Sequence, residues 1–207
     1  TLFQAWNYGG VRTGRGGFLG VRGQLLNYWG GNVNVQVRTD NLNPRGTRGG
    51  PATLAPANWT MNAVVYSDDR KELSGHAWTS YARNRYDGWG SSLGGGFIWR
   101  AAAGVELSFF PNVNRTRTIG QYVAASADPE ATATFGTRYV FGELLQNTVS
   151  ATIRMDVALS PDMSLQWYAQ PFIATGDYQI FKTLSEPGSY DFLVLGETGA
   201  STLVRNG

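Results

Sequence analysis

The first residues to consider are those whose spacing matches a catalytic motif. Residues 90–94 read Gly-Ser-Ser-Leu-Gly, which fits the G-x-S-x-G pattern that carries the nucleophilic serine of α/β-hydrolases. That motif needs a strand, a sharp turn and then a helix, and its histidine follows the serine in the chain. Here residues 95–98 continue as a predicted strand, and the only histidine, His76, precedes Ser92. The sequence therefore predicts no catalytic serine, and the glycines are better explained as relief of crowding in a strand.

Acidic residues that could form a glycosidase or metal site are present but show no suitable spacing. A single histidine cannot build a multi-histidine metal site, and the absence of cysteine excludes thiolate sites and disulfides. Glu106, Asp156 and Asp177 could supply a pair of catalytic carboxylates, but no spacing shows two of them facing each other. The loop acids lack the spacing of a calcium loop. We therefore predict no enzyme activity, no catalytic or metal-binding residue and no cofactor.

The composition favours a β-rich chain with much of its surface outside water. The chain has 207 residues, of which 27 are glycine, and charged residues make up only 15%, whereas typical soluble domains have roughly 25%. No apolar run reaches the roughly 18 residues that suggest a transmembrane helix. The 17 basic residues form no continuous run, which argues against nucleic acid as a partner.

Alternation with a period of two recurs along the chain and predicts antiparallel strands. In the clearest case, residues 148–159, every second residue from Val149 to Leu159 is apolar, and Thr, Ser, Arg or Asp stand between them as far as Asp156. Successive side chains of a strand point to opposite faces, so this segment has one apolar and one polar face. The pattern predicts about ten strands, near residues 18–28, 32–39, 58–67, 74–86, 89–100, 104–111, 117–125, 132–141, 147–159 and 163–174.

The predicted strands and their connections are typical of an up-and-down transmembrane β-barrel. Tilted segments of about ten residues can cross a bilayer core, and only a closed barrel satisfies all their backbone groups. Short connections such as 160–162 alternate with longer ones at 41–57, 142–146 and 175–189, as expected for periplasmic turns and outer loops. Two connections do not fit, because 68–73 is long for a turn and 86–89 is short for an outer loop.

The alternation also predicts which side chains share a face. One set is expected to face lipid: Val149, Ile153, Met155, Val157, Leu165 and Trp167. A second set is expected to face inward with Thr, Ser, Asn and Gln: Arg22, Arg38, Arg83, Arg100, Glu106, Arg138, Arg154 and Asp156. Because arginine exceeds acid in this second set, the lining would either favour anions in an open lumen or form a hydrogen-bonded ladder in a closed one.

Several segments between residues 139 and 192 carry a resemblance to a known family. They are TVSATIR at 148–154, the turn at 160–162, LQWYAQPF at 165–172, and Gly-Asp-Tyr at 176–178 followed by Phe181 and Lys182, while NYWGGNVNVQVR at 27–38 fits less specifically. These segments resemble the C-terminal part of bacterial outer-membrane barrels that begin with a family-9-like carbohydrate-binding domain and end in a domain of unknown function. The resemblance implies a barrel. The sugar-binding domain is missing here, and family members would continue beyond residue 207, so we expect a fragment of a longer chain.

Together these features predict a single all-β region, residues 1–207, that forms an antiparallel up-and-down transmembrane β-barrel or part of a larger one. Its expected location is the bacterial outer membrane and its expected role is structural, pore-forming or transport-type. The lipid bilayer is the main expected partner, with glycans and other outer-membrane or periplasmic proteins as further candidates. Two alternatives stay open: a carbohydrate-binding or carbohydrate-processing outer-membrane protein, and a soluble β-sandwich binding module, whose strands alternate in the same way.

Overall fold

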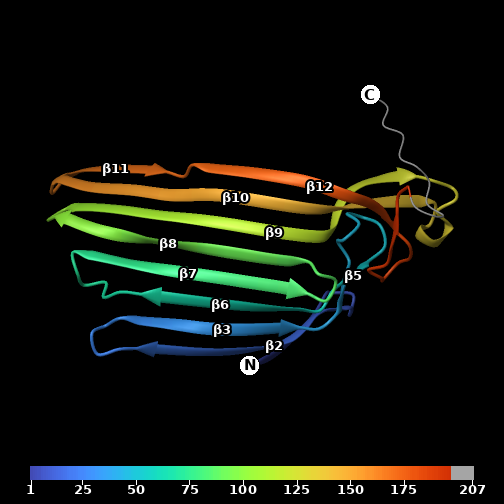
Figure 1. Cartoon of the computed structure of the whole chain (residues 1–207), viewed down its shortest axis with the longest axis horizontal. Coiled ribbons are helices and arrows are strands. Elements are labelled where there is room, and N and C mark those ends of the chain that lie inside the picture. The colour runs from blue at the N-terminus through green and yellow to red at the C-terminus, as the bar shows by residue number, and fades with distance from the viewer. Residues whose placement is uncertain (197–207) are drawn as a thin grey trace.

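The computed structural model describes residues 1–196, whose strands form one open antiparallel sheet and a small hairpin (Figure 1). The strands are β1 Leu2–Trp6, β2 Arg12–Gln24, β3 Gly30–Arg38, β4 Asn41–Asn43, β5 Thr53–Ala55, β6 Asn58–Tyr66, β7 Leu73–Asn84, β8 Trp89–Ala102, β9 Val105–Ala127, β10 Thr137–Ser160, β11 Met163–Ala169, β12 Phe172–Leu184 and β13 Phe192–Val194. The main sheet has the order β1-β2-β3-β6-β7-β8-β9-β10-β12-β13, and β11 also pairs with β10. Strands β4 and β5 form the separate hairpin.

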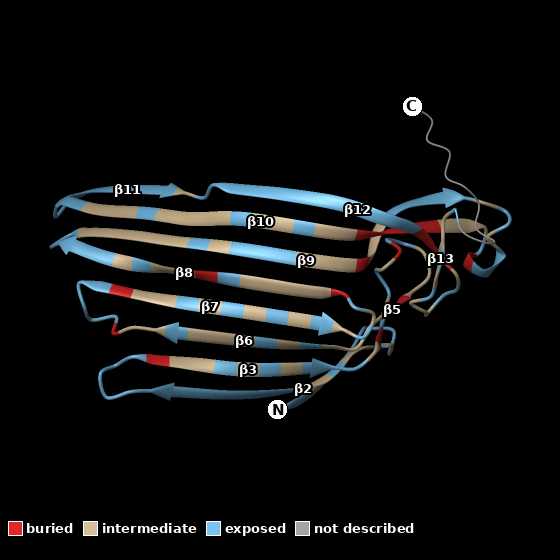
Figure 2. Cartoon of the chain, viewed as in Figure 1, coloured by how far each residue is buried: buried red, intermediate tan, exposed pale blue. Residues whose placement is uncertain are grey.

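The main sheet is a single layer. Exposed and half-buried residues dominate along its strands, and buried residues gather mainly where β5, β13 and the far part of β10 meet (Figure 2). The small apolar core at that place consists of Tyr139, Phe141 and Leu184, with Tyr122 and Phe192 packed against it. Within residues 1–196 no second sheet packs face to face with the first. These residues therefore do not form the two-sheet sandwich that the sequence left open.

The connections differ between the two ends of the sheet (Figure 1). One end, which we call the turn end, carries the connections 25–29, 67–72, 103–104 and 161–162. The opposite end, which we call the loop end, carries 39–57 with its β4–β5 hairpin, together with 85–88, 128–136 and 185–191. The long connection 41–57, the short turn at 160–162 and both expected exceptions, near 68–73 and 86–89, agree with the sequence.

The predicted all-β, up-and-down arrangement is confirmed. The described residues contain one helical segment, the three-residue 3-10 turn η1 Thr132–Thr134, and none of their helices could cross a bilayer. The segment 147–159 pairs with 163–169 in one sheet across the predicted turn, with Met155 opposite Trp167. The sheet formed by residues 1–196 is not closed into a barrel, because its path ends at β1 and β13 without a pairing between them.

Several predicted boundaries are wrong, because polar stretches also form strand. The predicted strands 104–111 and 117–125 belong to one strand, β9, and the second half of 132–141 is continuous with 147–159 in β10. The predicted connections 142–146 and 175–189 lie wholly or largely within β10 and β12. In these segments both faces of the strand carry polar residues, so the alternation of apolar and polar residues that predicts a strand is missing. The short strands β1, β4, β5 and β13 are not predicted either.

Glycines within β8 make room for large groups on the neighbouring strands. A Cβ atom at Gly94 would lie 2.2 Å from the Trp78 ring, and one at Gly96 would lie 1.9 Å from the carbonyl oxygen of Phe109. The segment that matches the serine motif, residues 90–94, lies inside this strand and no helix follows it. Its glycines therefore allow close approach between strands, which is a common use of glycine in a sheet.

Because a side chain at position 96 would press on the backbone of β9, Gly96→Ala should destabilise the sheet by about 1–3 kcal/mol, the usual cost of overpacking. The matched control is Gly23→Ala, because a Cβ at Gly23 would meet no atom within 4 Å. Denaturant unfolding followed by circular dichroism measures both changes. Equal stability of the two variants would contradict the close contact at Gly96.

Candidate functional site

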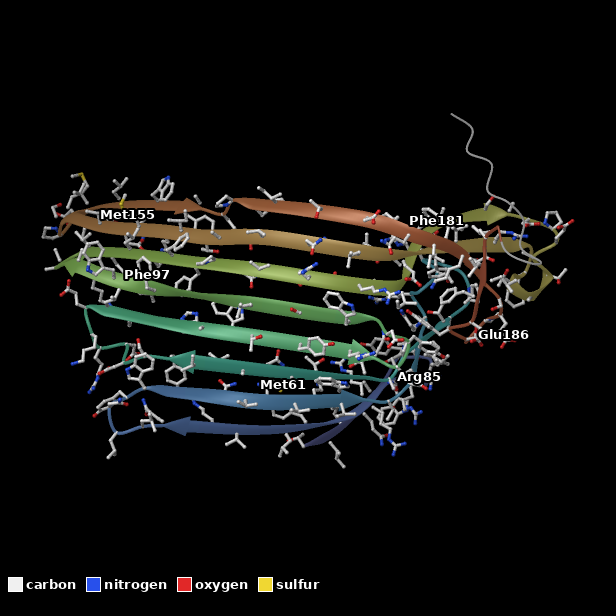
Figure 3. All side chains as sticks on the ribbon, in the orientation of Figure 1. Met61, Arg85, Phe97, Met155, Phe181 and Glu186 are labelled. Atoms are coloured by element: carbon white, nitrogen blue, oxygen red, sulfur yellow. The ribbon has the colours of Figure 1, made fainter. Side chains whose placement is uncertain are left out.

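The strand register places a continuous apolar surface on one face of the sheet, which we call the apolar face. One row of directly opposed residues crosses seven strands, from β3 to β12: Val33, Ala63, Thr79, Leu93, Val113, Val149 and Ile173. Leu165 and Trp167 lie opposite Val157 and Met155, so all six residues predicted to face lipid share this face. Its large side chains are exposed: Val149 is 53% exposed and Ile173 is 74% exposed. The labelled Met61, Phe97 and Met155 belong to the same face (Figure 3).

The opposite face, which we call the polar face, carries a row of amide and hydroxyl side chains. Its directly opposed members are Asn34, Asn62, Ser80, Ser92, Asn114 and Thr148. The amide nitrogen of Asn62 donates to the side-chain oxygen of Asn34 at 3.0 Å. Ser92 donates to the side-chain oxygen of Asn112, also at 3.0 Å. This row offers both donors and acceptors across six strands, a surface suited to water or to hydroxyl-rich solutes.

An aromatic patch lies beside this row on the polar face. His76 stacks on Phe110 with ring centroids 4.5 Å apart, and Trp78 lies 5.3 Å from His76 and 6.4 Å from Phe110. Tyr66 stands opposite His76 on the neighbouring strand. The rings extend over positions where the neighbouring strand has glycine, such as Gly94 and Gly96. The sequence did not reveal this patch, because strand β7 carries large residues on both faces and so hides its own alternation.

Charged residues form a compact group near the turn end of the polar face. Arg100 pairs with Glu106 at 3.2 Å, and Arg154 pairs with Asp156 at 2.7 Å. Glu106 and Asp156 stand directly opposite each other on β9 and β10. The register thus brings together two carboxylates whose spacing in the sequence gives no sign of it. Each carboxylate has an arginine partner: the Arg100–Glu106 pair joins β8 to β9, whereas Arg154 and Asp156 both belong to β10.

The predicted inward set is placed on one face with two exceptions. Arg22, Arg38, Arg100, Arg154, Glu106 and Asp156 all lie on the polar face. Arg83 is a correction, because it stands opposite Trp59 and Trp89 on the apolar face. Arg138 lies in the β9–β10 extension and pairs with Asp128 at 2.5 Å in the adjoining loop. The error at Arg83 has the same origin as the missed aromatic patch, the weak alternation of β7.

The loop end contains a group of charges in which Glu143 and Lys182 are buried. Glu143 accepts from Arg117 at 2.8 Å and pairs with Lys182 at 3.4 Å. Lys182 is only 7% exposed at its side chain, and its ammonium lies 4.9 Å from the Phe192 ring centroid. Two cations around one carboxylate offset the cost of burying charge. The labelled Arg85 and Glu186 also lie at this end of the molecule (Figure 3).

Loop groups outside the sheet have perturbed pKa values with clear causes. A hydrogen bond from the Arg70 side chain lowers the pKa of Asp68 to about 2. Burial raises the pKa of Tyr190 to about 12. The backbone N–H of Glu130 and the guanidinium of Arg138 both donate to Asp128 and lower the pKa of its carboxyl. These contacts order the connections between strands. They do not place a proton-donating and a proton-accepting group together as a catalytic pair would be. Among residues 1–196 no group of three His, Cys, Asp or Glu side chains is placed to hold a metal.

No protein-family model, curated protein or solved structure matches this chain. The geometry of the two faces is therefore the basis for assigning a function.

The Asp128 contacts give a pH dependence to the β9–β10 loop. A carboxyl whose pKa falls on folding contributes stability that is complete above its ordinary value, 3.8, and that is lost as the pH falls through the lowered pKa. Asp128→Asn should therefore speed amide hydrogen exchange of residues 128–138 at about pH 6, and the difference from the native chain should shrink toward about pH 2.5. Glu130→Gln in the same loop is the control. A difference that does not change with pH would rule out this contribution.

Proposed function

We propose that this chain forms a section of the wall of an outer-membrane β-barrel with a pore or transport-type role. The apolar face contacts lipid and the polar face lines the interior. Neither face of the main sheet is covered by a second sheet, and soluble monomers rarely expose continuous apolar patches larger than a few hundred Å². Exposing such a patch to water is unfavourable, and contact with lipid removes that penalty, because the apolar side chains then need no protein partner.

The observation that carries the proposal is the spacing of two tryptophans on the apolar face of β8. Trp89 and Trp99 are ten residues apart, so both point to the same side of the strand, with Leu93 and Phe97 between them. Ten strand residues span about 33 Å, and a tilt of roughly 35–45° reduces the height to about 23–27 Å. The apolar band of outer-membrane barrels is about 25 Å tall and is bounded by aromatic girdles. Trp59 and Tyr81, with ring centroids 5.4 Å apart, extend the row near Trp89.

The proposal also accounts for the different lengths of the connections at the two ends of the sheet. It further requires that the sheet close into a barrel. Outer-membrane barrels have short periplasmic turns and longer outer loops, so the turn end would be periplasmic and the loop end extracellular. The outer sides of the edge strands β11 and β12 have backbone groups that lipid cannot satisfy. Closure must therefore pair this edge with the β1–β2 edge or with further strands.

Substitutions at adjacent positions of β10 test the assignment of the faces. Ile153→Arg should strongly reduce the yield of assembled protein, because arginine near the midplane of the lipid face costs about 2–4 kcal/mol. Thr152→Arg places the same charge on the polar face and should be tolerated. Folded and unfolded forms can be separated by heat-modifiable electrophoresis after refolding into lipid. Equal tolerance of the two variants would mean that the faces are assigned wrongly.

Ion selectivity tests whether the polar face lines an open lumen. Arg22, Arg38, Arg100 and Arg154 lie on this face, and two of them are paired with Glu106 and Asp156, so a moderate preference for anions is expected. In planar bilayers the double change Arg22→Gln with Arg38→Gln should lower that preference. Arg83→Gln, on the apolar face, is the control and should leave it unchanged. Preference for cations, or no conductance at all, would exclude the anion-selective pore.

Carbohydrate handling is the second candidate function, and the aromatic patch favours it. The flat rings of His76, Trp78 and Phe110 lie beside a row of amides and hydroxyls, and sugars offer apolar ring faces together with many hydroxyls. The same recordings can test it, because added oligosaccharides should reduce the current and Trp78→Ala should weaken that block. A block that is unchanged in Trp78→Ala would remove the support for sugar binding at the patch.

A further inference from the structure

Three arginines stand together on the apolar face at the loop end. Arg83 and Arg117 lie on either side of Trp89 in one row of opposed residues across β7, β8 and β9. Arg115 lies two residues from Arg117 on β9 and opposite Ser91. All three face the side that the proposed function assigns to lipid. Tyr81 lies in the same row as Ser91 and Arg115, and Val113 is the next residue of this face toward the middle of the sheet, so the arginines stand at the edge of the apolar band.

Their surroundings leave these arginines with donors still available. Arg83 pairs with Asp87 at 2.5 Å, yet its side chain is 52% exposed. Arg117 donates to Glu143 at 2.8 Å and is 39% exposed. Arg115 is exposed, and it donates through Nε to the side-chain oxygen of Asn147 at 2.7 Å. A guanidinium has five N–H donors, so these contacts leave several donors free on each arginine.

The other end of the apolar face has no counterpart to this arginine group. In the strands at the turn end, the described residues of that face include Leu73, Trp99, Val105 and Leu159 and no arginine or lysine, and the nearby Arg70 and Lys71 belong to the connection 67–72. A general interfacial role for arginine would place it at both ends. The asymmetry points to negative charge in only one of the two leaflets.

We infer that Arg83, Arg115 and Arg117 bind the phosphate groups of lipid headgroups in the outer leaflet of the membrane. This inference rests on the proposed orientation, in which the loop end is extracellular. Arginine matches phosphate oxygens with paired donors, and its long side chain can extend from the apolar edge to the headgroup level. Trp89 lies between two of the arginines, where its ring can pack against the first part of the acyl chains. The site thus takes a phosphate-bearing lipid whose acyl chains lie along Leu93 and Val113.

Arg115 is the best residue to change, because its contact shown by the structure is to an amide and not to a buried acid. Arg115→Gln keeps a donor for Asn147 and removes the charge. Arg117 is less suitable, because its loss would leave the buried Glu143 with Lys182 as its remaining ion-pair partner. Arg38→Gln is the matched control, since Arg38 is also an exposed arginine of a long strand near the loop end but lies on the polar face.

The test measures lipid binding to the full chain assembled in detergent micelles, by native mass spectrometry. The probes are lipid A with two phosphates, the same lipid without phosphates, and soluble glucosamine phosphate. The native chain should bind the phosphorylated lipid preferentially, and Arg115→Gln should weaken that binding about tenfold, which corresponds to about 1.4 kcal/mol. Adding Arg83→Gln should weaken it further, whereas Arg38→Gln should change it less than about twofold.

The outcomes separate this inference from the proposed function. If the chain assembles but binds both lipids equally, or if Arg38→Gln weakens binding as much as Arg115→Gln, the phosphate site is wrong and the barrel wall is unaffected. Equal binding of soluble glucosamine phosphate would show a site for free phosphate and would overturn the lipid assignment. If the chain fails to enter micelles or bilayers, the proposed function fails, and the inference fails with it.

Discussion

The uncovered single layer of antiparallel sheet is the constraint on which the other features depend. In such a layer every strand residue points to one of two faces, and each face must suit the medium that it meets. Along β10, Val149 and Ile153 share one face while Thr148 and Thr152 share the other, and the register carries this division across the neighbouring strands. The two faces therefore differ in chemistry over most of the sheet, without a protein core between layers.

The remaining features follow from what each face must satisfy. On the polar face, amides and hydroxyls bond to one another, an ion pair joins β8 and β9, and glycines admit large rings. On the apolar face of the described strands, tryptophans stand near both ends of the band, and Arg83, Arg115 and Arg117 stand at its loop end. The buried charges of Glu143 and Lys182 lie in the small core at the loop end, where neighbouring segments cover them.

The sequence is sufficient to predict this fold where the two faces differ and insufficient where they do not. Alternation at 148–159 predicts both the strand and its pairing across the turn at residues 161 and 162, because one apolar face fixes the register. It misses the continuity of β9 and β10, where polar residues occupy both faces of the segments around Asn147 and Arg115. It also misplaces Arg83 and misses the patch around Trp78, because local pattern does not show which large residue lies over a glycine of the next strand.

The most direct test of the account is a scan of spin labels along β10. The chain has no cysteine, so single cysteines introduced at each position from 148 to 157 can be labelled without background. In bilayers, accessibility to oxygen should peak at Val149, Ile153 and the other odd positions, and accessibility to a water-soluble nickel complex should peak at the even positions. Equal accessibility of both faces to the nickel complex would contradict the assignment of the apolar face to lipid.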